Sequence, residues 1–318
     1  MENKKKRSPL GYFGLYVIGV IVGAADVIPG VSGGTMAFIL GIYEEMLNAI
    51  RSFASMRAVK MFANFKLKEA YRSLPWPFVL VLLLGVGSAA VLLAKPITWM
   101  LENRLSFILA FFFGLVAASV ITVLCRVGKF NVLLIPGLAA GTAIGWWVAG
   151  LTEGMQSPPD SWWYLVLCGA VAICAMILPG ISGSFILMLM GHYNTVMEAI
   201  KGLTGFRDVS DNLRILGCFF LGIVVGLASF AQLLSWMFKR WRNLTIVVLA
   251  GFMIGSLRKI WPWKFDDCFK GSNVLPEIDL NFWIAVALAV VGFALVVAIE
   301  LAARYFEMRQ KAAGKTSK

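Results

Sequence analysis

The sequence predicts an all-α polytopic membrane protein built from two inverted-topology repeats, each a re-entrant helical hairpin followed by three transmembrane helices. Of its 318 residues, 59% are hydrophobic and only 14% are charged, whereas soluble domains carry about 25% charged residues. Several apolar runs reach the roughly 20 residues that cross a hydrocarbon core. A motif broken by Pro and Gly occurs twice inside such runs, at 26–35 and 176–184.

The duplicated motif divides the chain into a first membrane repeat, 1–155, and a second, 156–318. At a constant offset of 150 the punctuating residues coincide: Pro29 with Pro179, Gly30 with Gly180, Ser32 with Ser182, Gly33 with Gly183 and Tyr43 with Tyr193. A weaker match at an offset of 137 pairs Gly85 with Gly222 and Gly114 with Gly251. Interrupted segments at matching positions of two halves are the best sequence indication of a transporter binding site.

The first repeat is predicted to begin with the hairpin 10–50, which turns at Pro29–Thr35. The N-terminus and the 51–72 loop are both rich in Lys and Arg, and basic loops stay on the cytoplasmic side. The hairpin therefore enters and leaves the membrane on the same side. The three spans that follow are 77–100, 105–124 and 132–151.

Three spans are an odd number, so the second repeat is predicted to be inverted. Its hairpin, 162–200, would start and end outside, and its spans are 215–238, 244–257 and 282–303. Both termini are then cytoplasmic, with 20 Lys and Arg in cytoplasmic segments and 8 in external ones, as the positive-inside rule requires. The alternative is that each broken run is a single kinked span, which makes the halves parallel and places a basic loop outside.

The breaks themselves predict an anion-binding site. Unpaired backbone in lipid costs several kcal/mol per group, so a Pro-Gly break must be buried in protein or face water. Glycines allow close backbone approach, and free N–H groups at a helix start favour an anion. The candidate binding residues are Asp26, Pro29, Gly30, Ser32, Gly33, Gly34, Thr35, Pro179, Gly180, Ser182, Gly183 and Ser184. The two breaks are expected to meet, with Ser32–Thr35 facing Ser182–Ser184. The alternative is a set of close-packing glycines with helix caps.

Basic side chains near span ends are candidates for the charge that a phosphate needs. These are Lys95, Arg104, Arg258 and Lys259, of which Lys95 and Arg258 complete the predicted binding set. The alternative for all four is that they extend to lipid headgroups.

Three titratable side chains are candidates for coupling transport to an ion, either a proton or sodium. Asp26 has no acidic counterpart, since Met176 takes its place, and a carboxylate within the membrane indicates function; a capping bond to its own loop is the alternative. His192 is the single histidine, and it either handles a proton or is simply hydrogen-bonded. Glu44 lies near the predicted cytoplasmic end, where an interfacial role is the alternative. No metal-ligand spacing is present, so neither metal nor cofactor is expected.

The two motifs, D-x-x-P-G-x-S-G-G-T from Asp26 and L-P-G-x-S-G-S from Leu178, resemble the polyprenyl-phosphate transporter family, long catalogued as a domain of unknown function. The run Gly255-Ser256-Leu257 and the hydropathy pattern are also similar to it. The resemblance implies that the substrate is undecaprenyl phosphate. It implies return of this lipid carrier from the outer to the inner leaflet of the bacterial cytoplasmic membrane, for reuse in peptidoglycan and other cell-envelope polysaccharides.

Two other functions stay open at this stage. A transporter of a small soluble anion could share the architecture. A lipid phosphatase is disfavoured by the single histidine and the lack of a phosphatase motif, so no enzymatic activity is expected. The net charge of +12 is assigned to cytoplasmic loops and not to nucleic-acid binding. The expected partners are the lipid substrate, membrane lipids and a coupling ion, with homo-oligomerisation left open.

Overall fold

The computed structural model of the chain describes residues 7–27, 32–55, 58, 60–61, 64–128, 131–151, 154–155, 157–159, 161–205, 208–265 and 272–315. These residues are almost entirely helical. The helices of the first half are α1 Pro9–Val27, α2 Gly33–Ile39, α3 Tyr43–Phe53, α5 Leu67–Ser73, α6 Trp76–Asn103, α7 Leu105–Cys125, the 3-10 turn η1 Val132–Leu134, and α8 Ile135–Gly150.

The second half repeats the order of a long helix, a break, a short helix, a tight turn and a further helix, followed by three longer helices. Its helices are α9 Trp162–Ile177, α10 Gly183–Leu189, α11 Tyr193–Thr204, α12 Val209–Arg240, α13 Arg242–Ser256 and α14 Leu280–Lys315. The predicted spans match these helices closely, except that α12 begins before 215 and α14 continues beyond 303.

Among the described residues, six helical segments are long and apolar enough to cross a membrane: α1, α6, α7, α12, α14, and the segment of η1 with α8. Both α9 and α13 are apolar but shorter. The 15 residues of α13 extend about 22 Å, less than a hydrocarbon core of about 30 Å. By length, α1 is a candidate span, although the sequence analysis assigned it to a hairpin, and α13, which corresponds to the predicted span 244–257, is shorter than that core.

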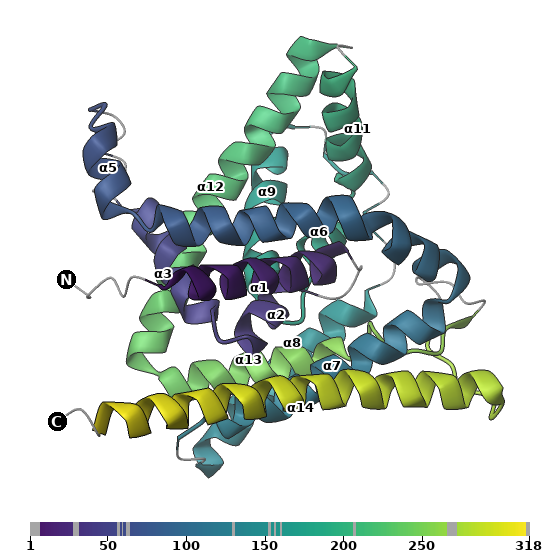
Figure 1. Cartoon of the computed structure of the whole chain (residues 1–318). Coiled ribbons are helices and arrows are strands. Elements are labelled where there is room, and N and C mark those ends of the chain that lie inside the picture. The colour runs from purple at the N-terminus through teal and green to yellow at the C-terminus, as the bar shows by residue number, and fades with distance from the viewer. Residues whose placement is uncertain are drawn as a thin grey trace.

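Each broken segment folds back on itself. In the first half, the guanidinium of Arg7 at the start of α1 forms an ion pair with Glu45 in the first turn of α3. In the second, the hydroxyl of Tyr164 at the start of α9 donates to the carbonyl of Met190, just before α11 (3.2 Å). The chain therefore returns after each break to the end from which it came. Figure 1 shows α3 at the left, where α1 begins.

Four helix pairs make the most extensive contacts in the molecule: α1 with α6, α9 with α12, α7 with α14, and α13 with α8. In the repeated sequence pattern, α9 corresponds to α1 and α12 corresponds to α6. The pair α1–α6 is therefore equivalent to the pair α9–α12. The other two pairs are equivalent as well, and each of them joins one half of the chain to the other. Figure 1 shows α14 lying along α7 at the bottom of the view.

Close glycine contacts recur at equivalent positions of the two halves. A Cβ atom at Gly85 in α6 would collide with the carbonyl oxygen of Tyr16 in α1. A Cβ atom at Gly222 in α12 would collide with the carbonyl oxygen of Val166 in α9. Tyr16 and Val166 are separated by the same 150 residues as the two broken motifs. The weak sequence match therefore corresponds to the same backbone contact made twice.

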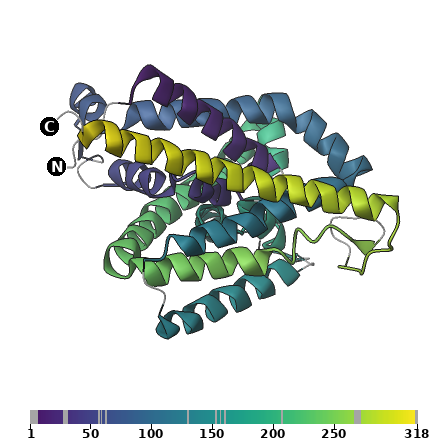
Figure 2. The ribbon, with the colours of Figure 1, turned by 60° about the horizontal axis from the view of Figure 1, so that its bottom comes forward.

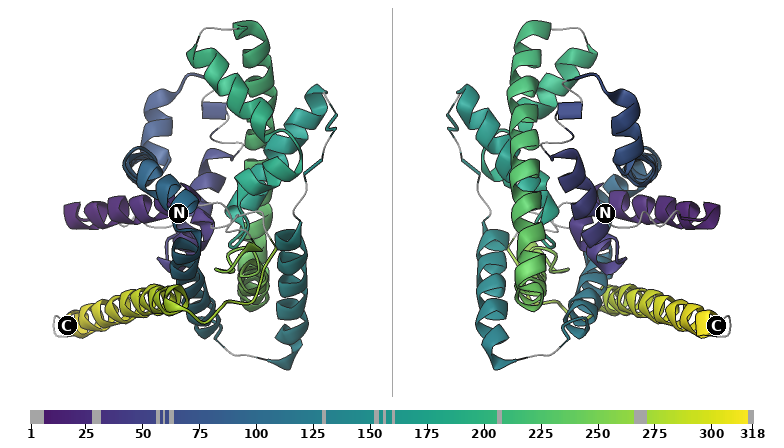
Figure 3. Two further views of the ribbon diagram at one scale, coloured as in Figure 1. Left: turned by 90° about the vertical axis from the view of Figure 1, so that its right-hand side faces the viewer. Right: turned by 90° about the vertical axis from the view of Figure 1, so that its left-hand side faces the viewer.

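The core is centred on α7, which is 61% buried, whereas each of the other candidate spans is 28% buried or less. The start of α1 and the end of α14 lie at the same end of the bundle in two views (Figures 1 and 2). Viewed along the bundle, α1 and α14 project to the same side of the molecule (Figure 3). The described residues beside the two breaks, Ser32, Thr35, Pro179 and Ser182, are buried.

Candidate functional site

The first break is the segment between α1 and α2, and the second is the segment between α9 and α10. Although the two breaks are far apart in sequence, Ser32–Thr35 beside the first contact residues 178–180 at the second. The hydroxyl of Ser32 donates to the carbonyl of Leu178 (3.3 Å). The backbone amide of Gly180 donates to Oγ1 of Thr35 (2.8 Å). Ser32 and Thr35 are both buried. The start of α2 and the residues after α9 therefore form one hydrogen-bonded cluster, as expected if the duplicated motifs build a shared site.

The end of α9 supplies most of the acceptors in this cluster. The last carbonyls of a helix have no partner within the helix. The hydroxyl of Tyr43, fully buried at the start of α3, donates to the carbonyl of Ile177 (3.0 Å). A Cβ atom at Gly34 would lie 2.8 Å from the same carbonyl oxygen, so glycine permits this approach. Tyr43 was not among the predicted site residues, although its coincidence with Tyr193 was a signal.

Asp26 and Ser32 cap the start of α2. The amide of Gly33 donates to Oδ1 of Asp26 (2.7 Å), and the amide of Gly34 donates to the hydroxyl of Ser32 (3.1 Å). A Cβ atom at Gly33 would lie 2.5 Å from the Asp26 carboxylate. Asp26 thus makes the capping bond that the sequence analysis named as its alternative role. In this conformation, its carboxylate accepts the hydrogen bond that a bound anion would accept.

Among the described residues, Ser182 at the second break forms no hydrogen bond with the residues that it was expected to face. Ser32–Thr35 was expected to face Ser182–Ser184, but its partners are residues 176–180, at the end of α9. The hydroxyls of Ser182 and Ser184 lie 2.9 Å apart, and Ser184 is exposed. Gly180 adopts a φ of +89°, a left-handed conformation that favours glycine.

A narrow cavity of about 10 Å³, room for about one water molecule, lies beside the second break. It is lined by Gly180, Ile181, Ser182 and Phe185, by Gly145, Val148 and Ala149 of α8, and by Lys259. The side chain of Lys259 is only 6% exposed, and its Nζ lies 4.3 Å from the centroid of the Phe185 ring. Of the basic candidates, Lys259 is therefore the one that shares a cavity with a residue of the predicted binding set.

Two more cations lie close to Lys259. The guanidinium of Arg258 donates to the carbonyl of Trp146 (3.2 Å) and stacks over its ring. Burial, together with the positive charges of Lys259 and Arg258, lowers the pKa of Lys264 to about 8. Lys264 also lines a cleft of about 660 Å³, between the α6–α7 junction and the segment before α14. Of these cations, Lys264 lines the cleft and Lys259 lines the cavity at the second break.

Three other predicted residues lie elsewhere in the fold. Lys95 is exposed on α6. The carboxylate of Glu44 forms an exposed ion pair with Arg242 (2.8 Å). The ring of His192 is buried and lies against that of Tyr164. Neither Glu44 nor His192 is a partner in the cluster formed by the two breaks.

Both ring nitrogens of His192 have partners. Nδ1 lies 3.3 Å from the hydroxyl of Thr195, and Nε2 lies 3.2 Å from the carbonyl of Pro159. His192 thereby holds the start of α11 against the segment before α9. The remaining predicted site residues, Pro29 and Gly30, lie outside the described residues. Pro179 is fully buried, and a Cβ atom at Gly183 would lie 2.6 Å from the carbonyl oxygen of Ala172.

Comparison with known proteins gives one consistent family. The family model described as undecaprenyl phosphate translocase-like matches residues 22–274. A Vibrio cholerae protein named polyprenyl-phosphate transporter is 40% identical over 255 residues, covering 80% of this chain and 79% of the relative. A Staphylococcus aureus protein with the same name is 25% identical over 293 residues, covering 86% and 91%. No solved structure matches the chain.

Proposed function

We propose, since the chain belongs to the undecaprenyl phosphate translocase-like family, that it returns undecaprenyl phosphate from the outer to the inner leaflet of the bacterial cytoplasmic membrane. The lipid carrier would then be reused in cell-envelope polysaccharide synthesis. We propose a transporter and not an enzyme, because both relatives carry the name of transporters.

The observation that carries this proposal is the buried Lys259 beside the second break. A phosphate headgroup crossing the membrane needs hydrogen-bond donors and compensating positive charge, because an isolated ion is costly in a low-dielectric interior. Lys259 supplies the charge and Ser182 a hydroxyl, and both line the same cavity, which would have to widen to admit a phosphate. Arg258 and Lys264 extend the positive region toward the larger cleft. The isoprenoid tail would stay in the surrounding lipid.

The first break would act through Asp26. Its carboxylate accepts the amide of Gly33, which is the type of donor that binds a phosphate oxygen. We propose that Asp26 and the substrate headgroup compete for this donor, and that a proton or sodium ion on Asp26 favours the substrate. Such competition would couple transport to an ion. The partners of Glu44 and His192 give these two residues a structural role, so Asp26 is the stronger coupling candidate.

In the membrane, we propose two inverted repeats with re-entrant hairpins at α1–α3 and α9–α11. The recurring glycine contacts and the return of the chain after each break support this arrangement. Both termini, α5 and the 239–242 turn would be cytoplasmic, and the 152–161 segment would be external. Labelling single cysteines in intact cells tests this orientation, and labelling of the 51–72 loop from outside contradicts it.

Binding of undecaprenyl phosphate to purified, folded protein tests the site. We expect Lys259→Met and Ser182→Ala each to weaken binding about tenfold to a hundredfold, since hydrogen bonds to charged groups contribute ~1.5–3 kcal/mol. The control is Lys239→Met, which removes an exposed lysine at the end of α12. Inorganic phosphate, added as a competitor, distinguishes a lipid transporter from a carrier of small anions. If both site variants bind as well as the parent, the headgroup site lies elsewhere.

A further inference from the structure

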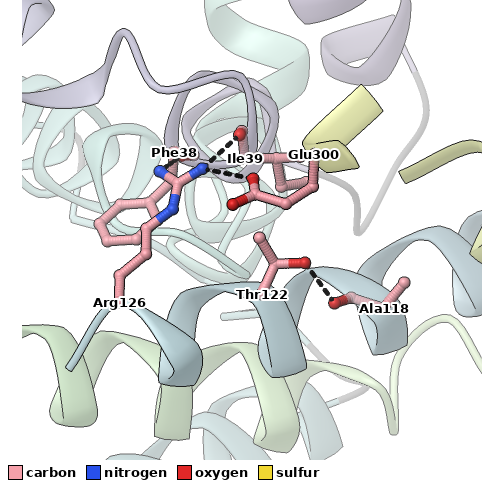
Figure 4. Close-up of polar contacts among 6 residues, drawn as sticks. All are labelled: Phe38, Ile39, Ala118, Thr122, Arg126 and Glu300. Carbon is pink, nitrogen blue, oxygen red and sulfur yellow. Dashed lines mark hydrogen bonds and ion pairs between the residues drawn. The ribbon is translucent and has the colours of Figure 1, made fainter. Parts of the chain in front are cut away.

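Arg126 connects the first break to two long helices. Its side chain, at the end of α7, faces the end of α2 (Figure 4). Nη1 donates to the carbonyl of Phe38 (3.3 Å), and Nη2 donates to the carbonyl of Ile39 (3.2 Å). Nη2 also lies 2.9 Å from Oε2 of Glu300 on α14. A single guanidinium therefore joins α2, α7 and α14.

This contact meets a specific need of α2. The last carbonyls of any helix lack partners within the helix, and all seven residues of α2 are buried. The carbonyl of Phe38 also accepts the amide of Gly41 (3.2 Å), so the guanidinium matters most for the carbonyl of Ile39. A guanidinium is suited to this place because its planar fork of donors can serve two carbonyls and a carboxylate together. Glu300 is itself largely buried, with its side chain 17% exposed, and it accepts from the same Nη2 that donates to Ile39.

The supports of Arg126 are rigid. Helix α7 is the most buried of the candidate spans and packs along α14 over an extensive surface. One turn before Arg126, the hydroxyl of Thr122 donates to the carbonyl of Ala118 in its own helix (3.1 Å), as Figure 4 shows. The Thr122 hydroxyl therefore donates within its own helix and not to the Glu300 carboxylate. The guanidinium of Arg126 bonds both α2 and that carboxylate.

The second break is held in a different way at the equivalent place. At the end of α10, the amide of Met155 donates to the carbonyl of Leu189 (2.8 Å). The hydroxyl of Tyr164 donates to the carbonyl of Met190 (3.2 Å). These donors are neutral, whereas the end of α2 is held by charge. The charged contact is thus a feature of the first half and not a general requirement of the repeated architecture.

We infer that Arg126, held by Glu300, is a positioning residue that sets α2, and with it Ser32–Thr35, against the end of α9. The seven residues of α2 extend only about 10 Å, so a displacement at Ile39 is transmitted to Ser32 at the other end. The consequence for transport rests on the proposed function, because it requires the first break to take part in headgroup binding. The placement of α2 does not depend on it.

Hydrogen–deuterium exchange on the purified full-length protein tests the placement. We expect Arg126→Met to raise exchange about tenfold or more in residues 33–43 and to leave the equivalent residues 183–193 unchanged. Arg126→Lys should recover part of the protection, because one ammonium can serve a carbonyl or Glu300. Glu300→Gln, which keeps an acceptor oxygen, should give a smaller increase. The matched control is Arg214→Met, which removes an exposed ion pair with Asp211 on α12.

The results separate a positioning role from general stabilisation. Equal increases in residues 33–43 and 183–193 would mean that the cluster supports the whole fold, and unchanged exchange would mean that other contacts hold α2. Either result overturns the inference. If Arg126→Met does not fold, Glu300→Gln decides the question in the same way. Undecaprenyl-phosphate binding is measured in parallel. If the parent itself does not bind the lipid, the proposed function is contradicted. The exchange measurement then still decides, by itself, whether Arg126 positions α2.

Discussion

At the scale of single residues, Asp26 combines a structural contact with a charge in an unusual place. Its carboxylate caps α2 through the amide of Gly33, so a purely structural role would need only an acceptor oxygen. An asparagine retains that oxygen and loses the charge. Substitution with asparagine therefore separates the two roles.

We expect Asp26→Asn to fold and reach the membrane at near-normal abundance, because a cap substitution that keeps the acceptor costs at most ~1 kcal/mol. Transport should be lost or should no longer respond to a pH or sodium gradient. The measurement is undecaprenyl-phosphate translocation in proteoliposomes over a range of pH. The control is Asp211→Asn, an exposed carboxylate on α12. Normal transport by Asp26→Asn at every pH would reduce Asp26 to a helix cap.

Lys264 predicts a pH dependence of binding. Burial and the neighbouring Lys259 and Arg258 lower its pKa from 10.5 to about 8. The proton is therefore lost as pH rises through 8, while a phosphate monoester, whose second pKa is about 6, is already mostly doubly ionised at pH 7. Binding of undecaprenyl phosphate should weaken between pH 7 and pH 9, and Lys264→Gln should remove this step. An identical pH profile in parent and variant would exclude Lys264 from the site.

The same pKa shift changes folding stability in the opposite direction: stability rises with pH where substrate binding weakens. The folded state releases the Lys264 proton near pH 8, and the unfolded state keeps it to about 10.5. Between these values the unfolded state binds more protons, so the contribution of Lys264 to folding stability rises with pH. Weaker binding above pH 8 therefore cannot be attributed to unfolding caused by this group.

At the scale of helices, the sequence predicted long elements well and their contacts poorly. The apolar run 105–124 is bounded by arginines, and α7 ends within one residue of the prediction. The predicted span 282–303 ends where the apolar residues end. The residues that follow are good helix formers, so α14 continues to Lys315. That the breaks would meet was predicted from the duplicated motif. Which carbonyls they would share depends on how α9 ends, and that is a tertiary property.

The glycine contacts between helices give a prediction at this scale. A Cβ atom at Gly114 in α7 would overlap the carbonyl oxygen of Ala289 in α14, whereas one at Gly87 in α6 meets open space. We expect Gly114→Ala to lower the free energy of unfolding by ~1–3 kcal/mol through overpacking. Gly87→Ala should be neutral or stabilise the protein by up to ~1 kcal/mol. Thermal unfolding in detergent measures both, and equal stability of the two variants would contradict the packing of α7 on α14.

At the scale of the whole molecule, two equivalent sets of helices surround the proposed site, to which the halves contribute unequally. The first break supplies Asp26 and a short helix held by Arg126 and Glu300. The second supplies Ser182 beside the buried Lys259. The sequence predicted the duplication but not this division, because Lys259 lies 77 positions after Ser182 and reaches the cavity only through the packing of α13 on α8.

The central claim is that this chain moves a polyprenyl phosphate across a membrane by way of the second break. The most direct test is to reconstitute the parent protein and Lys259→Met into liposomes and to follow labelled undecaprenyl phosphate as it leaves the outer leaflet. We predict that the parent redistributes the lipid between leaflets and that Lys259→Met, incorporated at equal density, does so at a rate close to that of protein-free liposomes. Redistribution at the parental rate by Lys259→Met, or none by the parent, would contradict the claim.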